Sequence, residues 1–253
     1  MPLRFFQLPS FDGSQRTVRI YTPDAYHQLP DQHFPVAYLQ DGQNMFADPR
    51  SARPETWCAD RAVEGLARDG QLPWILVGVD HAVDRFGEYS PWDYPRLGVR
   101  AKGEDYARWL VGSLKPFVDH HYRTRPQPEW TASIGSSLGG LISLYLGLAH
   151  PGTFGRIGAL SPTVMWSDRR LFSVWGAHPP YSTRIYLDAG AHEQLTIDGV
   201  TLDYGAETRR FHAHLQGLGY GDRELLLVLE PGGQHSEVDW RRRLPFALRW
   251  LLC

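Results

Sequence analysis

Short apolar runs alternate along this chain with longer segments whose apolar residues recur every three or four positions, and that alternation limits how the chain can fold. We predict strands at 16–22, 35–40, 74–79, 130–134, 156–160, 184–188 and 224–229. We predict helices at 57–68, 103–122, 138–149, 205–217 and 236–252, with a break or kink at Pro116 and at Pro245. Strands that alternate with helices favour a mostly parallel central sheet with helices on both faces, which is an α/β fold.

The length of the chain agrees with one such unit. The 253 residues are enough to bury a sizeable core, and the sequence contains no internal repeat and no linker-like stretch. We therefore expect a single domain over residues 1–253. Within it, residues 163–182 are the candidate for a small cap.

Charge and composition argue against several classes of partner. The formal net charge is -2, so no basic field exists to attract nucleic acid or an anionic membrane surface. No run approaches 18 apolar residues, and the N-terminus has no secretory signal pattern, so we expect a cytoplasmic protein with no membrane partner. The two cysteines, Cys58 and Cys253, are expected to be free thiols, and they lack metal-ligand spacing. The oligomeric state stays open.

The strongest local signal is a G-x-S-x-G motif between a predicted strand and a predicted helix. It reads Gly135-Ser136-Ser137-Leu138-Gly139. A strand, a sharp turn and a helix in this order predict a nucleophile elbow, in which the central serine sits in a strained conformation and the glycines leave room for the turn. The N-terminus of the following helix also favours a developing negative charge. The alternative interpretation is a glycine-rich helix cap without chemistry.

A nucleophilic serine needs a base and an acid, which follow it along the chain in this fold. His235 lies in a glycine-rich loop between strand 224–229 and the final helix, which makes it the predicted base. Glu193 follows strand 184–188 and is the predicted acid. Both come just after strands, where catalytic groups collect in open α/β sheets. The alternative acids are Asp188, Asp198 and Glu230.

The predicted oxyanion hole consists of two backbone N–H groups. One belongs to Leu138, directly after the nucleophile, and the other to Gln43, where Gly42 allows a sharp turn after strand 35–40. No residues are predicted as metal ligands. Three aromatic residues in loops beyond strands are candidates either for substrate binding or for core packing: Tyr89, Trp92 and Trp166.

Several of these stretches occur together in one known family. The segment from Val36 to Phe46 resembles the YLxDGQNxF stretch of the putative-esterase family of α/β-hydrolases. That family includes enterochelin esterases, feruloyl and acetyl-xylan esterases, S-formylglutathione hydrolases and mycolyltransferases. The similarity extends from about Arg19 to Leu252 through these further stretches: Arg85 with Glu88 to Trp92, Gly135 to Leu144, Ala159 to Pro162, Gly232 to His235, Trp240, Arg243 to Pro245, and Trp250 with Leu251.

The resemblance implies an α/β-hydrolase without a cofactor. It implies Ser137, Glu193 and His235 as nucleophile, acid and base, with Gln43 and Leu138 as oxyanion donors. The implied reaction is hydrolysis of a small-molecule acyl or aryl ester through an acyl-enzyme. Two other hypotheses remain at this stage: an acyltransferase that uses the same triad, and a non-catalytic binding protein on the same fold.

Overall fold

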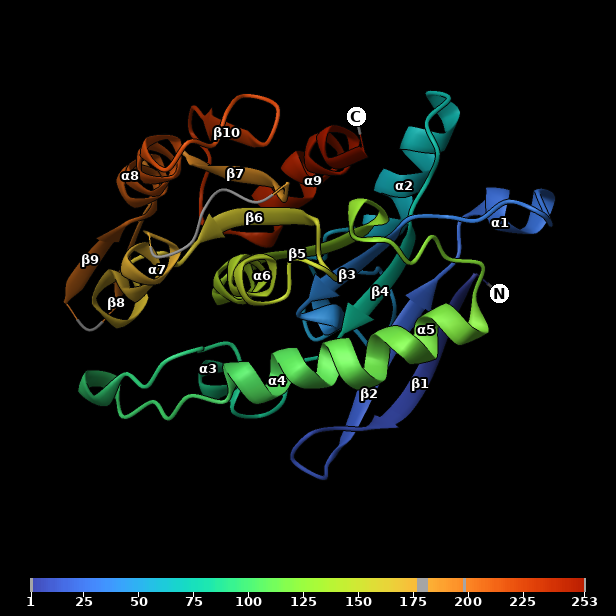
Figure 1. Ribbon diagram of the computed structural model, residues 1–253, viewed down its shortest axis with the longest axis horizontal. Helices are drawn as coiled ribbons and strands as arrows, with labels where there is room; N and C mark the ends of the chain where they lie inside the picture. The colour runs from blue at the N-terminus through green and yellow to red at the C-terminus, as the bar shows by residue number, and fades with distance from the viewer. Residues whose placement is uncertain (1, 177–181, 198, 253) are drawn as a thin grey trace.

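The central element is an eight-stranded sheet with strand order β1-β2-β4-β3-β5-β6-β7-β10 (Figure 1). A computed structural model describes residues 2–176, 182–197 and 199–252. The strands are β1 (Leu3–Pro9), β2 (Gln15–Tyr21), β3 (Val36–Gln40), β4 (Ile75–Val79), β5 (Thr131–Ser137), β6 (Arg156–Pro162), β7 (Arg184–Gly190) and β10 (Leu225–Glu230). All pairs from β4 to β10 are parallel, whereas β1 and β2 are antiparallel additions at one edge.

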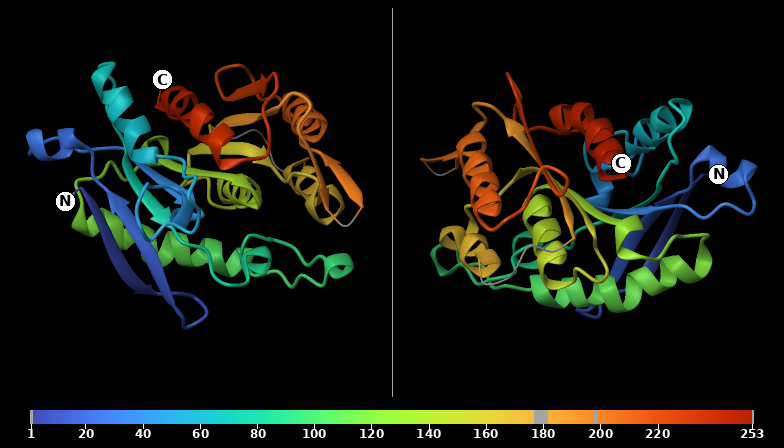
Figure 2. Two further views of the ribbon diagram at one scale, coloured as in Figure 1. Left: turned by 180° about the vertical axis from the view of Figure 1, so that it is seen from behind. Right: turned by 45° about the horizontal axis from the view of Figure 1, so that its top comes forward.

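Helices cover both faces of this sheet. On one face α2 (Ala59–Arg68) packs beside α9 (Glu237–Leu252). The other face is covered by α4 (Gly103–Trp109), α5 (Lys115–His121), α6 (Leu138–Ala149) and α8 (Tyr204–Gly217). The two turned views in Figure 2 show the same layers. Buried apolar side chains form one cluster on each face, and the predicted α/β fold is confirmed.

The remaining elements are short. They are α1 (Asp24–Gln28), α3 (Arg85–Glu88), α7 (Trp166–Gly176), the two-stranded β8 (Gln194–Ile197) and β9 (Val200–Asp203), and 3-10 turns at Gly42–Asn44, Pro95–Leu97 and Pro128–Trp130. The sequence patterns did not indicate β1, α1, α3, α7 or the β8–β9 pair. The described part of the predicted cap, 163–176, contains α7, whereas 177–181 lie outside the described residues, as does Cys253.

The two prolines predicted to disturb helices behave differently. Before Pro116, residues Leu110–Leu114 form a π-helical turn, and the Lys115 N–H donates to the Leu110 carbonyl five residues back. This turn joins α4 to α5 in one continuous rod (Figure 1). Pro245 lies inside α9, which continues to Leu252 without a break. Within the described ranges, no helix combines the length and apolarity needed to span a bilayer.

Candidate active site

Ser137 stands at the sharp turn that the G-x-S-x-G motif predicts. It ends β5 and precedes α6, and its backbone has φ 55° and ψ −123°, which non-glycine residues rarely adopt. The two flanking glycines explain how the turn closes. A Cβ at Gly135 would lie 2.5 Å from the carbonyl carbon of Gly139, and a Cβ at Gly139 would lie 3.1 Å from the Asp41 carboxylate. A side chain at Gly135 would therefore force the backbone of the turn apart, and one at Gly139 would press on Asp41.

His235 and Glu193 form a close pair at the same edge of the sheet. The Nδ1 atom of His235 lies 2.6 Å from Oε1 of Glu193, whose side chain is fully buried. Burial alone would raise the pKa of Glu193. The hydrogen bonds from His235 and from the Gly190 amide outweigh burial and hold this pKa below its ordinary value. The carboxylate therefore stays charged, and it can fix the imidazole tautomer with its proton on Nδ1.

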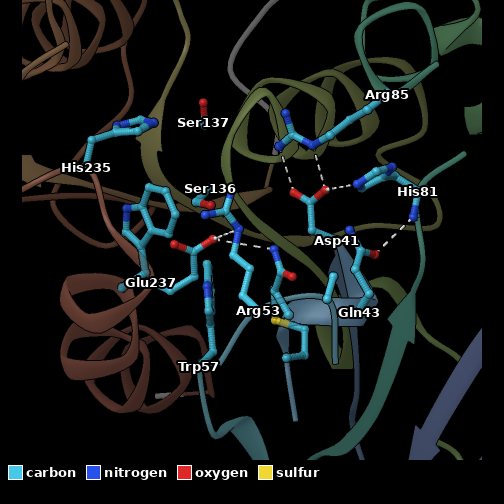
Figure 3. A pocket seen from close by; sticks show the side chains of 14 residues that line it. Asp41, Gln43, Arg53, Trp57, His81, Arg85, Ser136, Ser137, His235 and Glu237 are labelled. Atoms are coloured by element: carbon cyan, nitrogen blue, oxygen red, sulfur yellow. Dashed lines mark hydrogen bonds and ion pairs between the residues drawn. The ribbon is translucent and has the colours of Figure 1, made fainter. Parts of the chain in front are cut away.

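Two aromatic rings hold the imidazole in place. The centroid of the Tyr204 ring lies 4.2 Å from that of the His235 ring. The Trp240 ring meets the imidazole edge-on, with 4.9 Å between the ring centroids. Ser137 and His235 line one pocket, and Figure 3 shows their side chains next to each other. The Ser137 hydroxyl hydrogen-bonds to the hydroxyl of Thr163 at 3.2 Å, a contact that no sequence pattern indicated.

The two predicted oxyanion donors lie at the ends of the paired strands β3 and β5. Leu138 is the first residue of α6, and Gln43 lies in the 3-10 turn after β3, so neither N–H has a partner within its own helix. Asp41 enters this turn in a left-handed conformation, with φ 59°. Both of its carboxylate oxygens accept hydrogen bonds from the Arg85 guanidinium, at 2.6 and 2.8 Å, which fixes the turn.

The three predicted pocket aromatics lie outside the lining of the Ser137 pocket. Tyr89 is fully buried, and its hydroxyl accepts the backbone N–H of Asp41 at 2.9 Å, so it packs in the core, the alternative that the sequence left open. Trp166 is also buried and donates its indole N–H to the Ser90 hydroxyl. Trp92 lines a separate hollow of about 710 Å³. We therefore assign none of the three a substrate contact.

The alternative acids have other partners. Asp188 is fully buried at the end of β7, where it accepts hydrogen bonds from the Tyr186 hydroxyl and the Ser161 amide. Burial raises the pKa of Asp188 to about 7. Glu230 pairs with the Arg242 guanidinium at 2.7 Å, and Asp198 lies outside the described residues. Among the described candidates, Glu193 is the carboxylate in contact with the predicted base.

The pocket has a volume of about 590 Å³, and most of its lining side chains can hydrogen-bond. The Arg53 guanidinium forms an ion pair with Glu237 at 3.1 Å, so the segment before α2 is tied to the start of α9 across the pocket (Figure 3). Trp57 and Trp240 also belong to the lining, although both side chains are almost fully buried. The other lining residues are Asp41, Gln43, Asn44, Met45, Ala52, His81, Arg85, Ser136, Ser137 and His235. In the described part of the chain, no three His, Cys, Asp or Glu residues gather as metal ligands.

Known proteins match this chain along most of its length. The profile of the family described as "Putative esterase" matches residues 10–251. The chain is 24% identical to "Uncharacterized protein YbbA" of Bacillus subtilis over 96% of its own length and 95% of that protein. It is 26% identical to an "Endo-1,4-beta-xylanase/feruloyl esterase" of Xylanibacter ruminicola, of which it spans 28% while matching over 92% of its own length.

Solved structures share the fold. The enterobactin esterase FES from Shigella flexneri, solved in the presence of enterobactin, superposes with a TM-score of 0.78 at 22% identity. The match covers 99% of this chain and 58% of that one. At this identity, the superposition shows the fold alone.

Proposed function

This chain belongs to the putative-esterase family and is a carboxylic ester hydrolase, and we propose that it is a serine esterase. Its proposed catalytic triad is Ser137–His235–Glu193. One observation carries the assignment of residues. The His235 imidazole is held by the buried Glu193 carboxylate at 2.6 Å, in the same pocket as a serine on a strained strand-to-helix turn. This arrangement supports the proposal, because an activated serine needs a base held by a carboxylate in the same site.

In the proposed mechanism, His235 takes the proton from the Ser137 hydroxyl through Nε2 as the oxygen attacks the ester carbonyl. Glu193 stabilises the resulting imidazolium through Nδ1. The imidazolium then protonates the departing alcohol, which leaves an acyl group on Ser137. Water attacks this acyl-enzyme by the same route, the acid is released and the serine is restored.

The negative charge that develops on the carbonyl oxygen is stabilised by backbone N–H groups. We assign this role to Leu138 and Gln43, whose amides open the helical turns after β5 and β3. The Arg85–Asp41 ion pair and the Tyr89 hydroxyl hold the turn after β3, which carries Gln43, in place. Donors fixed in this way before the reaction stabilise the transition state without reorganisation.

For the substrate, we propose a small acyl or aryl ester that carries polar groups. Asn44 and Arg53 offer hydrogen bonds to such groups, and the largely buried Trp57 and Trp240 complete the lining beside them. Two relatives in the comparisons carry the names feruloyl esterase and enterobactin esterase, and in both cases this chain spans less than two thirds of the protein. The cytoplasmic location remains a prediction from the sequence.

The test is Ser137→Ala, measured on p-nitrophenyl esters that differ in acyl length and aromatic character. We expect kcat/KM to fall by about 10⁴-fold or more, because the alanine removes the nucleophile. The unfolding midpoint should change little, because the side-chain hydrogen bond that Ser137 loses is the 3.2 Å contact with Thr163. Ser173→Ala is the matched control, since Ser173 is exposed on α7 and bonds only the Arg170 carbonyl. Full activity in Ser137→Ala would contradict the proposal.

The same assay separates the remaining hypotheses. An acyltransferase would form a transesterified product when an alcohol acceptor is added, whereas a hydrolase releases the free acid. A fluorophosphonate probe should label Ser137 in the wild-type protein. No labelling would favour a binding protein without catalysis.

A further inference from the structure

Ser161 occupies an unusual position beside the proposed triad. It lies near the end of β6, its side chain is fully buried, and its backbone is left-handed with φ 42°. A non-glycine residue in this region costs backbone free energy, and such residues persist where their surroundings hold them in place. The proposed mechanism gives Ser161 no task, although the residue belongs to the stretch Ala159 to Pro162 that resembles the family.

The Ser161 hydroxyl uses its full hydrogen-bonding capacity. It donates its proton to Oε2 of Glu193 at 2.8 Å. It accepts the indole N–H of Trp240 at 3.1 Å and one N–H of the Arg243 guanidinium at 2.9 Å. A hydroxyl has one proton and two lone pairs, and here all three are used. Three buried side chains, Glu193 after β7 and both Trp240 and Arg243 of α9, therefore meet on one oxygen atom.

Two of these contacts connect Ser161 indirectly to His235, one through Glu193 and the other through Trp240. Glu193 binds Nδ1 of His235 through Oε1, while its Oε2 receives the Ser161 proton and the Gly190 amide at 2.7 Å. Trp240, the second partner of the hydroxyl, meets the His235 ring edge-on. The same hydroxyl thus fixes the carboxylate that orients the imidazole and the ring that packs against it.

The third partner ties this arrangement to buried charge. The Arg243 guanidinium is 5% exposed and lies 3.4 Å from Asp188, 3.6 Å from Glu230 and 3.9 Å from Glu193. The Ser161 backbone N–H donates to Asp188 at 3.2 Å, while its hydroxyl accepts from Arg243. Ser161 therefore binds both an acidic and a basic member of this charged cluster. A cluster of this kind has a defined arrangement only if each polar group keeps its partner.

We propose that Ser161 is the positioning residue of the acid–base half of the site: its hydroxyl holds Glu193 and Trp240 in the geometry that His235 requires. This inference rests on the proposed triad. Ser161 touches no reacting atom, so it acts through Glu193 and Trp240 alone.

Loss of the hydroxyl should leave a signature on the base. The Ser161 hydrogen bond is one of the contacts that lower the pKa of Glu193, so a variant without the hydroxyl holds the carboxylate that faces His235 less firmly in its charged form and geometry. The other charged and titratable groups around the pair are retained in such a variant, although Arg243 loses one hydrogen-bond acceptor. They are Tyr204 of α8, Arg243 of α9 with Asp188 and Glu230, and across the pocket Glu237 with Arg53 and Asp41 with Arg85.

The experiment uses Ser161→Ala and Ser161→Gly in the full chain. Both remove the hydroxyl, but glycine also relieves the left-handed backbone, so the pair separates hydrogen bonding from backbone strain. For both we expect kcat to fall about 10-fold or more with KM changed less than 2-fold. We also expect the acidic limb of the kcat/KM profile to move to higher pH. Ser161→Gly should unfold at a higher temperature than Ser161→Ala and still show the same kinetic loss.

Ser143→Ala is the matched control, because Ser143 is a buried serine of α6 that accepts a hydrogen bond from Ser133. It should lower the unfolding temperature without moving the pH profile. If Ser161→Ala and Ser161→Gly keep the wild-type kcat and pH profile, Ser161 is a structural residue and the inference is overturned. Ser137→Ala, assayed in parallel, tests the triad separately: an active Ser137→Ala overturns the proposed function, whereas an inactive one leaves the Ser161 result to be judged by itself.

Discussion

Two buried carboxyl groups, one in β7 and one just after it, have pKa values shifted in opposite directions. Glu193 accepts from an imidazole, a hydroxyl and an amide, and these donors hold its pKa low although the side chain is buried. For Asp188, burial outweighs its partners, and the pKa rises to about 7. A carboxyl group with a raised pKa favours its neutral form, which suits a buried position but not an imidazolium partner. This difference supports Glu193 as the proposed acid.

The raised pKa of Asp188 predicts how stability depends on pH. Between the unfolded value near 3.8 and about 7, the folded protein keeps a proton that the unfolded chain has released, so this group destabilises the fold as pH rises through that window. Asn has the shape of the protonated acid but does not titrate. We expect the free energy of unfolding of wild type to fall more steeply between pH 5 and 7 than that of Asp188→Asn. The slopes should differ by up to about 1.4 kcal/mol per pH unit.

The measurement is urea unfolding of wild type and Asp188→Asn at several pH values, with both proteins in the same buffers. Groups other than Asp188 titrate in both proteins, so their contributions cancel in the difference. Parallel slopes would mean that Asp188 is already ionised in the folded protein at pH 5.

At this scale, the sequence could predict some positions and not others. Ser137 is marked by its glycines, and His235 and Glu193 by their places just after strands. Ser161 belongs to a stretch that resembles the family, but neither its role nor that of Thr163 can be predicted from the sequence, because both depend on hydrogen bonds to the distant elements α9 and β5. The expected pocket role of Tyr89, Trp92 and Trp166 followed from loop position, but the direction in which a loop side chain points is set by packing.

At the scale of elements, the strand β5, the turn and the helix α6 form one unit whose geometry depends on missing side chains. The Cβ that an alanine would add at Gly135 meets backbone atoms of Gly139 at 2.5 Å, and backbone cannot move aside as a flexible side chain can. Gly112, in the π-helical turn, has open space around the equivalent position and a helical backbone. The two glycines therefore form a matched pair for substitution.

We expect Gly135→Ala to lower the free energy of unfolding by about 3 kcal/mol and to abolish most ester hydrolysis, because the turn that holds Ser137 must open. Gly112→Ala should raise the free energy of unfolding by about 0.5–1 kcal/mol and leave activity unchanged, since alanine is the better helix former. Urea unfolding and a p-nitrophenyl ester assay measure both effects. Equal stability of the two variants would show that the turn tolerates a side chain at Gly135.

The helical rod from α4 to α5 shows what element-level patterns can and cannot reveal. The apolar stripe predicted one helix over 103–122, and the missing N–H of Pro116 predicted a disturbance in it. The disturbance proves to be a π-helical turn, in which the Lys115 N–H reaches Leu110. Sequence alone cannot choose between a kink and a π-turn, because the choice depends on how the rod packs against the sheet. Pro245 likewise predicts a break or kink in its helix, but α9 continues past it to Leu252. A proline in the sequence therefore does not by itself determine the local helix geometry.

At the scale of the whole molecule, one buried ion pair joins the antiparallel edge of the sheet to the site. Arg16 of β2 and Glu88 of α3 form two hydrogen bonds, at 2.5 and 2.6 Å, with both side chains almost fully buried. The same short helix carries Arg85, and Tyr89 follows it, so this pair also steadies the residues that hold the Asp41 turn. The edge strands thus support the pocket from a distance.

Breaking this pair should be costly. In Glu88→Gln the Arg16 guanidinium stays charged and buried without its counter-ion, and we expect the free energy of unfolding to drop by about 3–5 kcal/mol. Asp105→Asn breaks an exposed pair with Arg108 and should cost less than about 1 kcal/mol. Chemical denaturation of both variants measures the difference. A loss below about 1 kcal/mol in Glu88→Gln would mean that water reaches Arg16.

Topology was predictable from the sequence only where strands and helices alternate regularly. The parallel strands from β3 to β10 followed from their apolar runs. β1 did not, because Leu3–Pro9 mixes apolar and polar residues and becomes a strand through its partner β2. The β8–β9 hairpin is equally inconspicuous, since its residues are mostly exposed and carry little apolar signal.

The groups that line the pocket lie at or after the ends of β3, β4, β5 and β10 and on α3 and α9, and the Glu193–Ser161 contact adds β6 and β7. Along the chain the lining extends from Asp41 to Trp240. A fragment that lacks any one of these strands would hold scattered side chains and no smaller version of the site. The site is therefore a property of the whole sheet, and its assembly depends on the same long-range strand pairings that complete the fold.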